Sequence, residues 1–394
     1  MADLNLLTTQ TTGKIVYAID AWIPNQDRMT GVQQYSFQLI QAMKQHVLAE
    51  NERVVLYTYK KLTGPLADLP TGWEERVLAW PPRRGWMSVR VSWELWRHPP
   101  SVFFVPGQAL PRFAGATLTT IHDVAFARRP DLYDPAVCRR LKRVTKRAIR
   151  KATRILVPSQ ATKQDLIDLY HVSDDRIVVT HEAVNTKVFH PYSLEDARAT
   201  LQQHRFGTNF FLVVGRLEKK KNLTMLIRAF ELFKTRRGVG DPFELILVGE
   251  PGYGYGEIKK YIDLSVHKES IRTPGYLSDE EVAPLMSAAT AYLFPSWYEG
   301  FGIPNLQAMA TGTTLITSDI PAHQEVVLDA GLLVPPEKAE AWAHALERVV
   351  KEGSLRVELV QKGKQRVTDF SWERTAVQTL DTLRGLVGTQ TKNR

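Results

Sequence analysis

Residues 293–312 read LFPSWYEGFGIPNLQAMATG. An apolar run that ends at Phe294 predicts a buried strand, and a glycine-rich loop then leads into a helix expected to begin at Pro304 or Asn305. Proline is favourable at a helix start because its missing N–H would have no partner there. The amino terminus of such a helix presents free N–H groups and a partial positive charge, so the stretch predicts a strand, loop and helix with a phosphate site.

Glu299 lies in this loop, just ahead of the predicted helix. A carboxylate beside a phosphate site is not expected to bind the phosphate itself. It can hydrogen-bond hydroxyls or stabilise positive charge on a neighbouring sugar carbon. An acidic residue near a helix start is also favoured by the helix dipole alone, so this stretch by itself leaves both roles open.

A second loop carries positive charge. The run VVGRLEKKKN (213–222) places a glycine after a predicted strand and then Arg216 and Lys221, just before a helix expected to start near Asn222. Open α/β sheets bind ligands at the carboxyl ends of their strands, and two cations there suit a diphosphate. Basic residues are also common on surface loops, so the run alone does not distinguish a diphosphate site from an ordinary surface loop.

Outward from these loops, short apolar runs alternate with amphipathic helices along the whole chain, which predicts an α/β fold of two doubly wound, Rossmann-like halves. The expected strands are 15–20, 54–58, 102–105, 117–121, 154–158 and 177–180, then 209–214, 243–248, 291–294 and 314–317. We place the domain boundary after residue 188, giving domains 1–188 and 189–371. A last helix, capped by Ser371, is expected over 372–394.

The composition excludes several classes. A chain of 394 residues with 44% hydrophobic and 24% charged residues is globular and large enough for two domains. The single cysteine, Cys138, allows no disulfide framework or cysteine-based metal cluster, which fits a cytoplasmic protein. The ten histidines form no metal-ligand motif. The amino end lacks a secretion signal, and no apolar run approaches the roughly 20 residues that span a bilayer.

The net charge of +9 is concentrated in one segment, because nine of the sixteen residues Arg139–Arg154 are Arg or Lys. Its apolar residues recur at helical spacing, which predicts either an ordinary helix with a solvated basic face or a contact surface for an anionic membrane. Residues 80–97 interleave Trp80, Trp86, Trp93 and Trp96 with arginines. Core packing and peripheral contact with the inner face of a membrane both remain open for this segment. No nucleic-acid-binding module is recognisable.

Two features of the first half also lie near expected ligand positions. Gly31, in TGVQQYS (30–36), comes close to a helix start, which alone is weak evidence. His122 and Asp123 follow the strand predicted over 117–121, and titratable groups at strand ends cluster at ligand sites. A His–Asp contact that only tethers a loop is the alternative.

With these residues in place, the chain resembles the glycosyltransferases of family 4, which are retaining, nucleotide-sugar-dependent and often mannosyltransferase-like enzymes. Their GT-B architecture consists of two facing Rossmann-like domains with an interdomain cleft. Seven stretches carry the resemblance in the family's order: TGVQQYS (30–36), TIHDVAFARRPDLYDP (120–135), RILVPSQATKQDL (154–166), VVGRLEKKKNL (213–223), residues 275–313, SDIPAHQEVVLDAGLLVPP (318–336) and FSWERTA (370–376).

The resemblance implies roles for individual residues. Arg216 and Lys221 would neutralise the diphosphate of a GDP- or UDP-sugar, which the loop at Gly31 would approach from the first domain. His122 would lie beside the donor sugar and acceptor, and Glu299 would contact the transferred sugar. The backbone N–H groups of the loop and helix start would bind sugar and phosphate; these residues are Gly300, Phe301, Gly302 and Ile303.

The resemblance further implies transfer of a hexose to a glycan or lipid-linked acceptor in polysaccharide biosynthesis, with no metal and no cofactor other than the sugar nucleotide. By the same likeness, the final helix would cross back onto the first domain. One position departs from the family, because Gln307 replaces the second carboxylate of the Glu-seven residues-Glu motif. A glutamine can still accept and donate hydrogen bonds, so we expect altered nucleotide binding. A catalytically silent sugar-nucleotide-binding homologue is the alternative.

Overall fold

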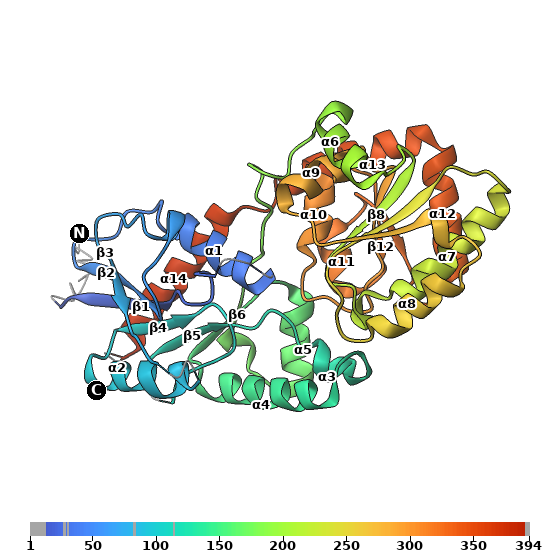
Figure 1. Cartoon of the computed structure of the whole chain (residues 1–394). Coiled ribbons are helices and arrows are strands. Elements are labelled where there is room, and N and C mark those ends of the chain that lie inside the picture. Colours follow the sequence, from blue (N-terminus) through green and yellow to red (C-terminus); the bar gives the residue numbers. More distant parts are fainter. Residues whose placement is uncertain (1–12, 27–28, 30, 82–83, 113–114, 391–394) are drawn as a thin grey trace, which may run out of the picture. The chain divides into compact units, whose positions relative to one another are not determined.

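A computed structural model of the chain describes residues 13–26, 29, 31–81, 84–112 and 115–390. Two parallel sheets with interleaved helices confirm the predicted α/β class (Figure 1). The chain divides into two compact units. The first contains the residues up to Thr120, Arg147–Leu156 and the residues from Ala376 onward, and the second contains Ile121–Lys146 and Val157–Thr375. The domain boundary after residue 188 stays a prediction.

The first sheet has seven strands in the order β3-β2-β1-β4-β5-β6-β7, and every pair from β3 to β6 is parallel. The strands are β1 (Ile15–Asp20), β2 (Glu52–Thr58), β3 (Trp73–Val77), β4 (Val102–Val105), β5 (Thr117–Thr120), β6 (Arg154–Val157) and β7 (Ile177–Val179). The helices in this part of the chain are α1 (Gly31–Met43), α2 (Ser92–Arg97), α3 (Ala125–Arg128), α4 (Pro135–Lys151) and α5 (Gln160–Tyr170).

The second sheet has the order β10-β9-β8-β11-β12-β13. Its strands are β8 (Phe210–Val214), β9 (Glu244–Val248), β10 (Ile271–Gly275), β11 (Ala291–Phe294), β12 (Leu315–Ser318) and β13 (Leu332–Val334). The helices are α6 (Leu194–His204), α7 (Leu223–Arg237), α8 (Tyr255–Leu264), α9 (Asp279–Ala288), α10 (Ile303–Ala310), α11 (Pro321–Val327), α12 (Ala339–Lys351) and α13 (Gly353–Val367). The strand order reverses between β8 and β11, and a crevice at the carboxyl ends of the strands is expected at such a point.

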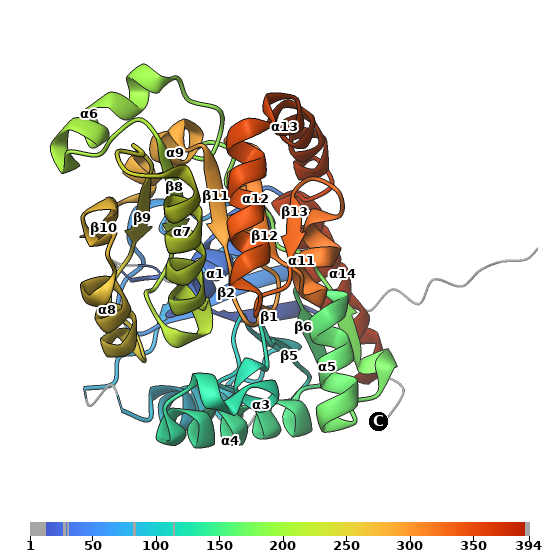
Figure 2. The same cartoon turned by 90° about the vertical axis from the view of Figure 1, so that its right-hand side faces the viewer.

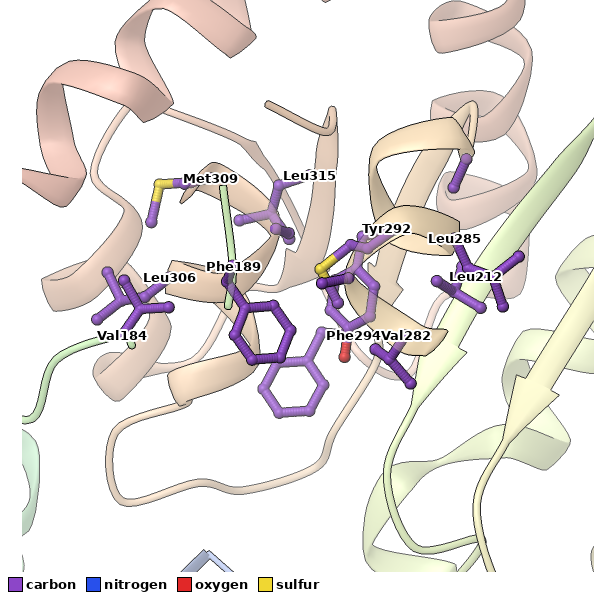
Figure 3. Packing of buried hydrophobic residues seen from close by; sticks show 14 of the residues in the cluster. Val184, Phe189, Leu212, Val282, Leu285, Tyr292, Phe294, Leu306, Met309 and Leu315 are labelled. Atoms are coloured by element: carbon purple, nitrogen blue, oxygen red, sulfur yellow. The ribbon is translucent and has the colours of Figure 1, made fainter. Parts of the chain in front are cut away.

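Alternate residues of the second sheet fill two hydrophobic cores. On one face Phe211 and Val213 pack with α7 and α12, which lie side by side in Figure 2. On the other face Phe210 and Leu212 pack with α9 and α10. Figure 3 shows this second core, a single buried cluster to which Phe294, Phe189, Val282 and Leu306 belong. A strand buried on both faces requires nearly continuous apolar sequence, as these strands have.

The final helix, α14 (Trp372–Gln390), joins the first unit from Ala376 onward. Within that unit Arg384 donates two hydrogen bonds to the Glu52 carboxylate, at 2.9 and 3.0 Å. Glu52 also accepts a hydrogen bond from the Tyr17 hydroxyl at 2.9 Å. The bidentate pair therefore ties the helix to β2. The last four residues of the helix predicted over 372–394 lie outside the described residues.

The structure corrects several local predictions. Strands β3, β10 and β13 were not predicted, and α10 begins at Ile303, not at Pro304 or Asn305. The prediction of core packing is wrong for two of the tryptophans, because Trp93 is 50% exposed and Trp96 is 68% exposed. Trp86, by contrast, is buried. Arg83, in the same segment, and Thr30, beside Gly31, lie outside the described residues. No helix in the part of the chain that the structure describes is long and apolar enough to cross a membrane.

Candidate active site

The candidate site lies where the second sheet reverses its strand order, at the carboxyl ends of β8 and β11. The loop after β8 contains a short 3₁₀ turn, Lys219–Lys221, and the loop after β11 carries Glu299. The two loops are joined directly, because the Trp297 N–H donates to the Lys220 carbonyl at 3.0 Å. Asn222 strengthens the junction, since its side-chain amide donates to the Pro295 carbonyl at 3.1 Å. The fold thus brings together the two loops that the sequence singled out.

Glu299 and Lys221 form the closest ion pair of the site. The Lys221 Nζ donates to Glu299 Oε1 at 2.7 Å, and the Lys220 Nζ lies 3.6 Å from Glu299 Oε2. All three side chains are between 12% and 15% exposed. Burial raises the pKa of the Glu299 carboxyl, but the two lysines lower it more, so the pKa falls to about 2. Glu299 is therefore an anion at neutral pH, held close to two cations.

The loop after Glu299 is built around two glycines. A Cβ on Gly300 would lie 1.8 Å from the His122 carbonyl oxygen, so only glycine fits there. The Gly300 carbonyl accepts hydrogen bonds from the hydroxyls of Ser159 and Thr162. Gly302 precedes α10 with a φ of 97°, a conformation that favours glycine. These constraints fix the backbone N–H groups that lead into the helix.

Apolar contacts also hold the loop after Glu299 in place. Phe301 is buried, with its ring centroid 5.7 Å from that of Phe370 and 6.0 Å from the His181 ring. Ile303 is half-buried and packs against the core that contains Phe294. Because both side chains point into packed surroundings, the loop presents backbone and not side chains at the helix start.

His122 and Asp123 turn to different partners. The His122 Nδ1 lies 3.2 Å from Glu182 Oε1, and the Lys220 Nζ lies 3.6 Å from Asp123 Oδ2. The second unit therefore places both residues beside the Glu299 loop. Sequence reasoning missed Glu182, although a carboxylate two residues after the strand predicted over 177–180 could have been noticed.

Lys220 was also missed. Burial lowers the pKa of its ammonium group, but Glu299 and Asp123 raise it more, and the net shift is well above the ordinary value. A run of three lysines gives no indication of which one is buried. His323 is a further missed residue: its ring stacks on Phe294 with centroids 4.9 Å apart, and burial lowers its pKa to about 4, so it is neutral at pH 7.

Three predicted residues are not drawn into this cluster. Arg216 is exposed, and its side chain lies against Gly252, where a Cβ would come within 3.0 Å of it. Gln307 is half-buried in α10, one turn from its start. Gly31 begins α1 in the first unit, and a Cβ added there would meet nothing within 4 Å. Their roles toward a ligand stay predictions.

Comparison with known families decides the class of protein. The family model described as "Glycosyl transferases group 1" matches residues 198–366, and the one described as "Glycosyltransferase Family 4" matches residues 29–188. The chain is a family 4, group 1 glycosyltransferase. This glycosyltransferase is 26% identical over 383 residues to O-antigen chain mannosyltransferase B of Escherichia coli, a match that covers 93% of this chain and 98% of the relative.

Solved structures show the fold of the glycosyltransferase. Superposition on HepE of Anabaena in complex with UDP-glucose gives a TM-score of 0.72 at 16% identity, over 94% of this chain and 99% of HepE. Sucrose-phosphate synthase from Thermosynechococcus elongatus gives 0.70 at 22% identity, over 95% of this chain and 100% of the other. The predicted GT-B fold is thereby confirmed.

Proposed function

We propose that this glycosyltransferase moves a hexose, mannose or a similar sugar, from a nucleotide-diphosphate sugar to a hydroxyl of a glycan or lipid-linked acceptor. The ion cluster of Glu299 with Lys220 and Lys221 at the strand-order reversal carries the proposal. Cations beside a helix amino terminus suit a diphosphate, and an anion beside them suits the hydroxyls of a sugar. The name of the E. coli relative, an O-antigen chain mannosyltransferase, supports a mannosyl donor and a polysaccharide product.

In the proposed mechanism the donor diphosphate lies against Lys221 and Arg216 and against the N–H groups at the start of α10. As the bond to the anomeric carbon breaks, negative charge grows on the leaving phosphate, and these preorganised groups stabilise it without a metal ion. Glu299 holds hydroxyls of the transferred sugar and opposes the positive charge that develops on its ring. Gln307 contacts the nucleotide through its amide.

Retention of configuration follows if the acceptor hydroxyl approaches from the face that the phosphate leaves. The leaving phosphate oxygen then takes the proton of that hydroxyl while the new glycosidic bond forms. His122, held by Glu182, lies on the Gly300 side of the site and would orient the acceptor and the donor sugar. In this scheme the protein supplies positioning and charge, which account for a large share of rate enhancement in such transfers.

The first experiment is thermal melting of the protein with GDP, UDP, ADP and their common sugar conjugates. A micromolar ligand at millimolar concentration stabilises the native state by roughly 4 kcal/mol, which gives a clear shift. A hit is followed by turnover with wild type and Glu299→Gln, which is nearly isosteric. We expect the variant to retain nucleotide binding and lose at least about 100-fold in kcat.

A variant with normal kcat would remove Glu299 from the mechanism. A nucleotide-dependent shift without turnover of any donor would favour the silent sugar-nucleotide-binding homologue. Absence of any shift would contradict nucleotide binding itself and point to Gln307 as the cause.

We further propose that the first half of the chain contacts an anionic membrane. The exposed residues Arg139, Arg143, Lys146 and Arg150 recur at helical spacing and form one basic stripe on α4. On α2, Trp93 and Trp96 are exposed. Tryptophan favours the membrane interface, and each basic residue near an anionic surface contributes about 1 kcal/mol.

The two helices are linked through Arg112, whose N–H donates to Ser92 Oγ at 2.7 Å and whose carbonyl accepts from Lys151 Nζ. Co-sedimentation with vesicles of phosphatidylglycerol and phosphatidylcholine tests the proposal. We expect binding that is lost with pure phosphatidylcholine and weakened by Trp93→Ala with Trp96→Ala. Equal binding by that double variant and the wild type would refute the role of α2.

A further inference from the structure

Three consecutive lysines occupy three different environments in the turn Lys219–Lys221. Lys219 is exposed and donates to the Asp131 carbonyl at 3.1 Å. Lys221 pairs closely with Glu299 and lies over the Phe294 ring, 4.7 Å from its centroid. Lys220 is 13% exposed and stands between two carboxylates, with its Nζ 3.6 Å from both Asp123 and Glu299.

Lys220 holds the Glu299 loop at two points. Its carbonyl accepts the Trp297 N–H at 3.0 Å, and its ammonium group faces the carboxylate of Glu299 two residues further on. The same ammonium group reaches Asp123, which follows His122. A single residue thus connects the loop after β11 with the segment that carries His122.

The charges of this cluster explain why two lysines are needed. Asp123 and Glu299 contribute two negative charges, and Lys220 and Lys221 contribute two positive ones. In the proposed function the donor diphosphate attracts Lys221. If Lys221 were the only cation at Glu299, diphosphate binding would leave a buried carboxylate without its partner, which is strongly unfavourable.

We infer that Lys220 is a positioning residue that holds Glu299 in place and paired with a cation when Lys221 turns to the donor diphosphate. The inference rests on the proposed function, and it separates the roles of adjacent lysines. Lys221 binds the donor diphosphate, whereas Lys220 pairs with the Glu299 carboxylate. Asp123 keeps Lys220 centred between the two segments.

Other titratable groups also face this pair. Tyr133 and Glu218 act on Lys220, and both favour its charged form, while His323 acts on Glu299. The charge of Lys220 lowers the pKa of Glu299, and Lys221 lowers it as well, through both its charge and its hydrogen bond. Removal of Lys220 should therefore raise the pKa of Glu299 even while Lys221 is present.

The test compares Lys220→Met with Lys221→Met and with Lys219→Met as the matched control, using whichever of GDP or UDP binds the wild type. We expect Lys220→Met to lower kcat by about 100-fold while the nucleotide Kd stays within about threefold. The acid limb of its kcat profile should move up by about one pH unit or more, because a cation near 4 Å has been lost. Lys220→Arg should recover part of the activity.

Lys221→Met should instead weaken nucleotide binding, and Lys219→Met should behave as wild type. Two results would overturn the inference. One is a Lys220→Met enzyme with normal kcat and an unshifted pH profile. The other is a Lys220→Met enzyme that loses nucleotide affinity as Lys221→Met does, which would make Lys220 a phosphate ligand.

A double-mutant cycle tests the pair without any turnover. In urea unfolding, the midpoint shift caused by Lys220→Met should be about halved or less in a Glu299→Gln background, because contacting residues are coupled. Additive shifts would overturn the inference. If the wild-type protein neither binds nor turns over any sugar nucleotide, the proposed function is refuted. The double-mutant cycle would still measure the coupling between Lys220 and Glu299.

Discussion

Gly300→Ala is the most severe small substitution that the site predicts. The added Cβ would lie 1.8 Å from the His122 carbonyl oxygen, 2.9 Å from its carbon and 3.0 Å from the Asp123 Cβ. Protein Cβ atoms do not approach other atoms closer than 3.0 Å, so the segments must separate by at least 3.0 − 1.8 = 1.2 Å. The obstacle is backbone, which cannot rotate away. Gly300 has no positive φ, so its requirement is purely steric.

A displacement of this size has two consequences. Overpacking costs about 1–3 kcal/mol, which should lower the melting temperature by several degrees. Since Glu299 is the adjacent residue, a shift of about 1 Å should also reduce kcat by about 100-fold. The hydrogen bonds from Ser159 and Thr162 to the Gly300 carbonyl oppose relaxation of the loop.

The assay measures thermal melting and kcat on the donor identified by the nucleotide panel. Gly385→Ala is the matched control, because Gly385 is exposed in α14 and nothing lies within 4 Å of its added Cβ. That variant should gain up to about 1 kcal/mol from helix propensity and keep full activity. If Gly300→Ala melts and turns over like the wild type, the close approach of the two segments is wrong.

Asp20 is buried at the end of β1, and burial raises its pKa from 3.8 to about 7. Its carboxyl ionises in the unfolded chain at a lower pH than in the fold, so the free energy of unfolding should fall as the pH rises from about 4 to 7. Asp20→Asn should remove this loss, up to about 4 kcal/mol of unfolding free energy, and equal pH dependence in both proteins would contradict the burial argument. Hydrogen bonds from Arg384 lower the pKa of Glu52 from 4.5 to about 2, so their stabilisation is present above pH 4.5 and is lost as the pH falls toward 2. Glu52→Gln should lower the unfolding free energy at pH 7 by about 2 kcal/mol, and denaturant titration at pH 7 and pH 3 checks this. Arg216→Ala with Lys221→Ala should weaken GDP or UDP binding by about 100-fold in calorimetry, since two charge-assisted contacts are lost, and unchanged affinity would refute the phosphate assignment.

Of the thirteen strands in the described part of the chain, ten were predicted from the sequence to within two residues, because most of them are buried apolar runs. The three missed strands lack that signal. β3 reads WEERV and β10 reads IRTPG, which are charged or contain proline and glycine, and β13 has only three residues. Each is an outermost strand of its sheet. Sheet edges need less apolar sequence, so periodicity fails there first.

Within the site, sequence reasoning found Glu299 and Lys221 because each follows a recognisable strand. It could not find Lys220, since burial among Lys219–Lys221 depends on how the 3₁₀ turn orients each side chain. It could not pair His122 with Glu182, because 60 residues separate them and only the tertiary fold brings them to 3.2 Å. The exposure of Trp93 and Trp96 was likewise hidden, because helical spacing describes a stripe without stating what covers it.

The assignment of α14 to the first unit has a consequence for biosynthesis. The first unit is assembled from the start of the chain, a short internal stretch and the carboxyl-terminal residues from Ala376 onward. All of the second unit has been translated before those last residues emerge, whereas the first unit must wait for them with the apolar surface beneath α14 uncovered. Domains that fold during synthesis usually do so from the amino end. Here the unit that contains β1 is completed only after α14 has been translated, so a ribosome that stalls before Ala376 would leave that unit unfinished although its sheet is already synthesised.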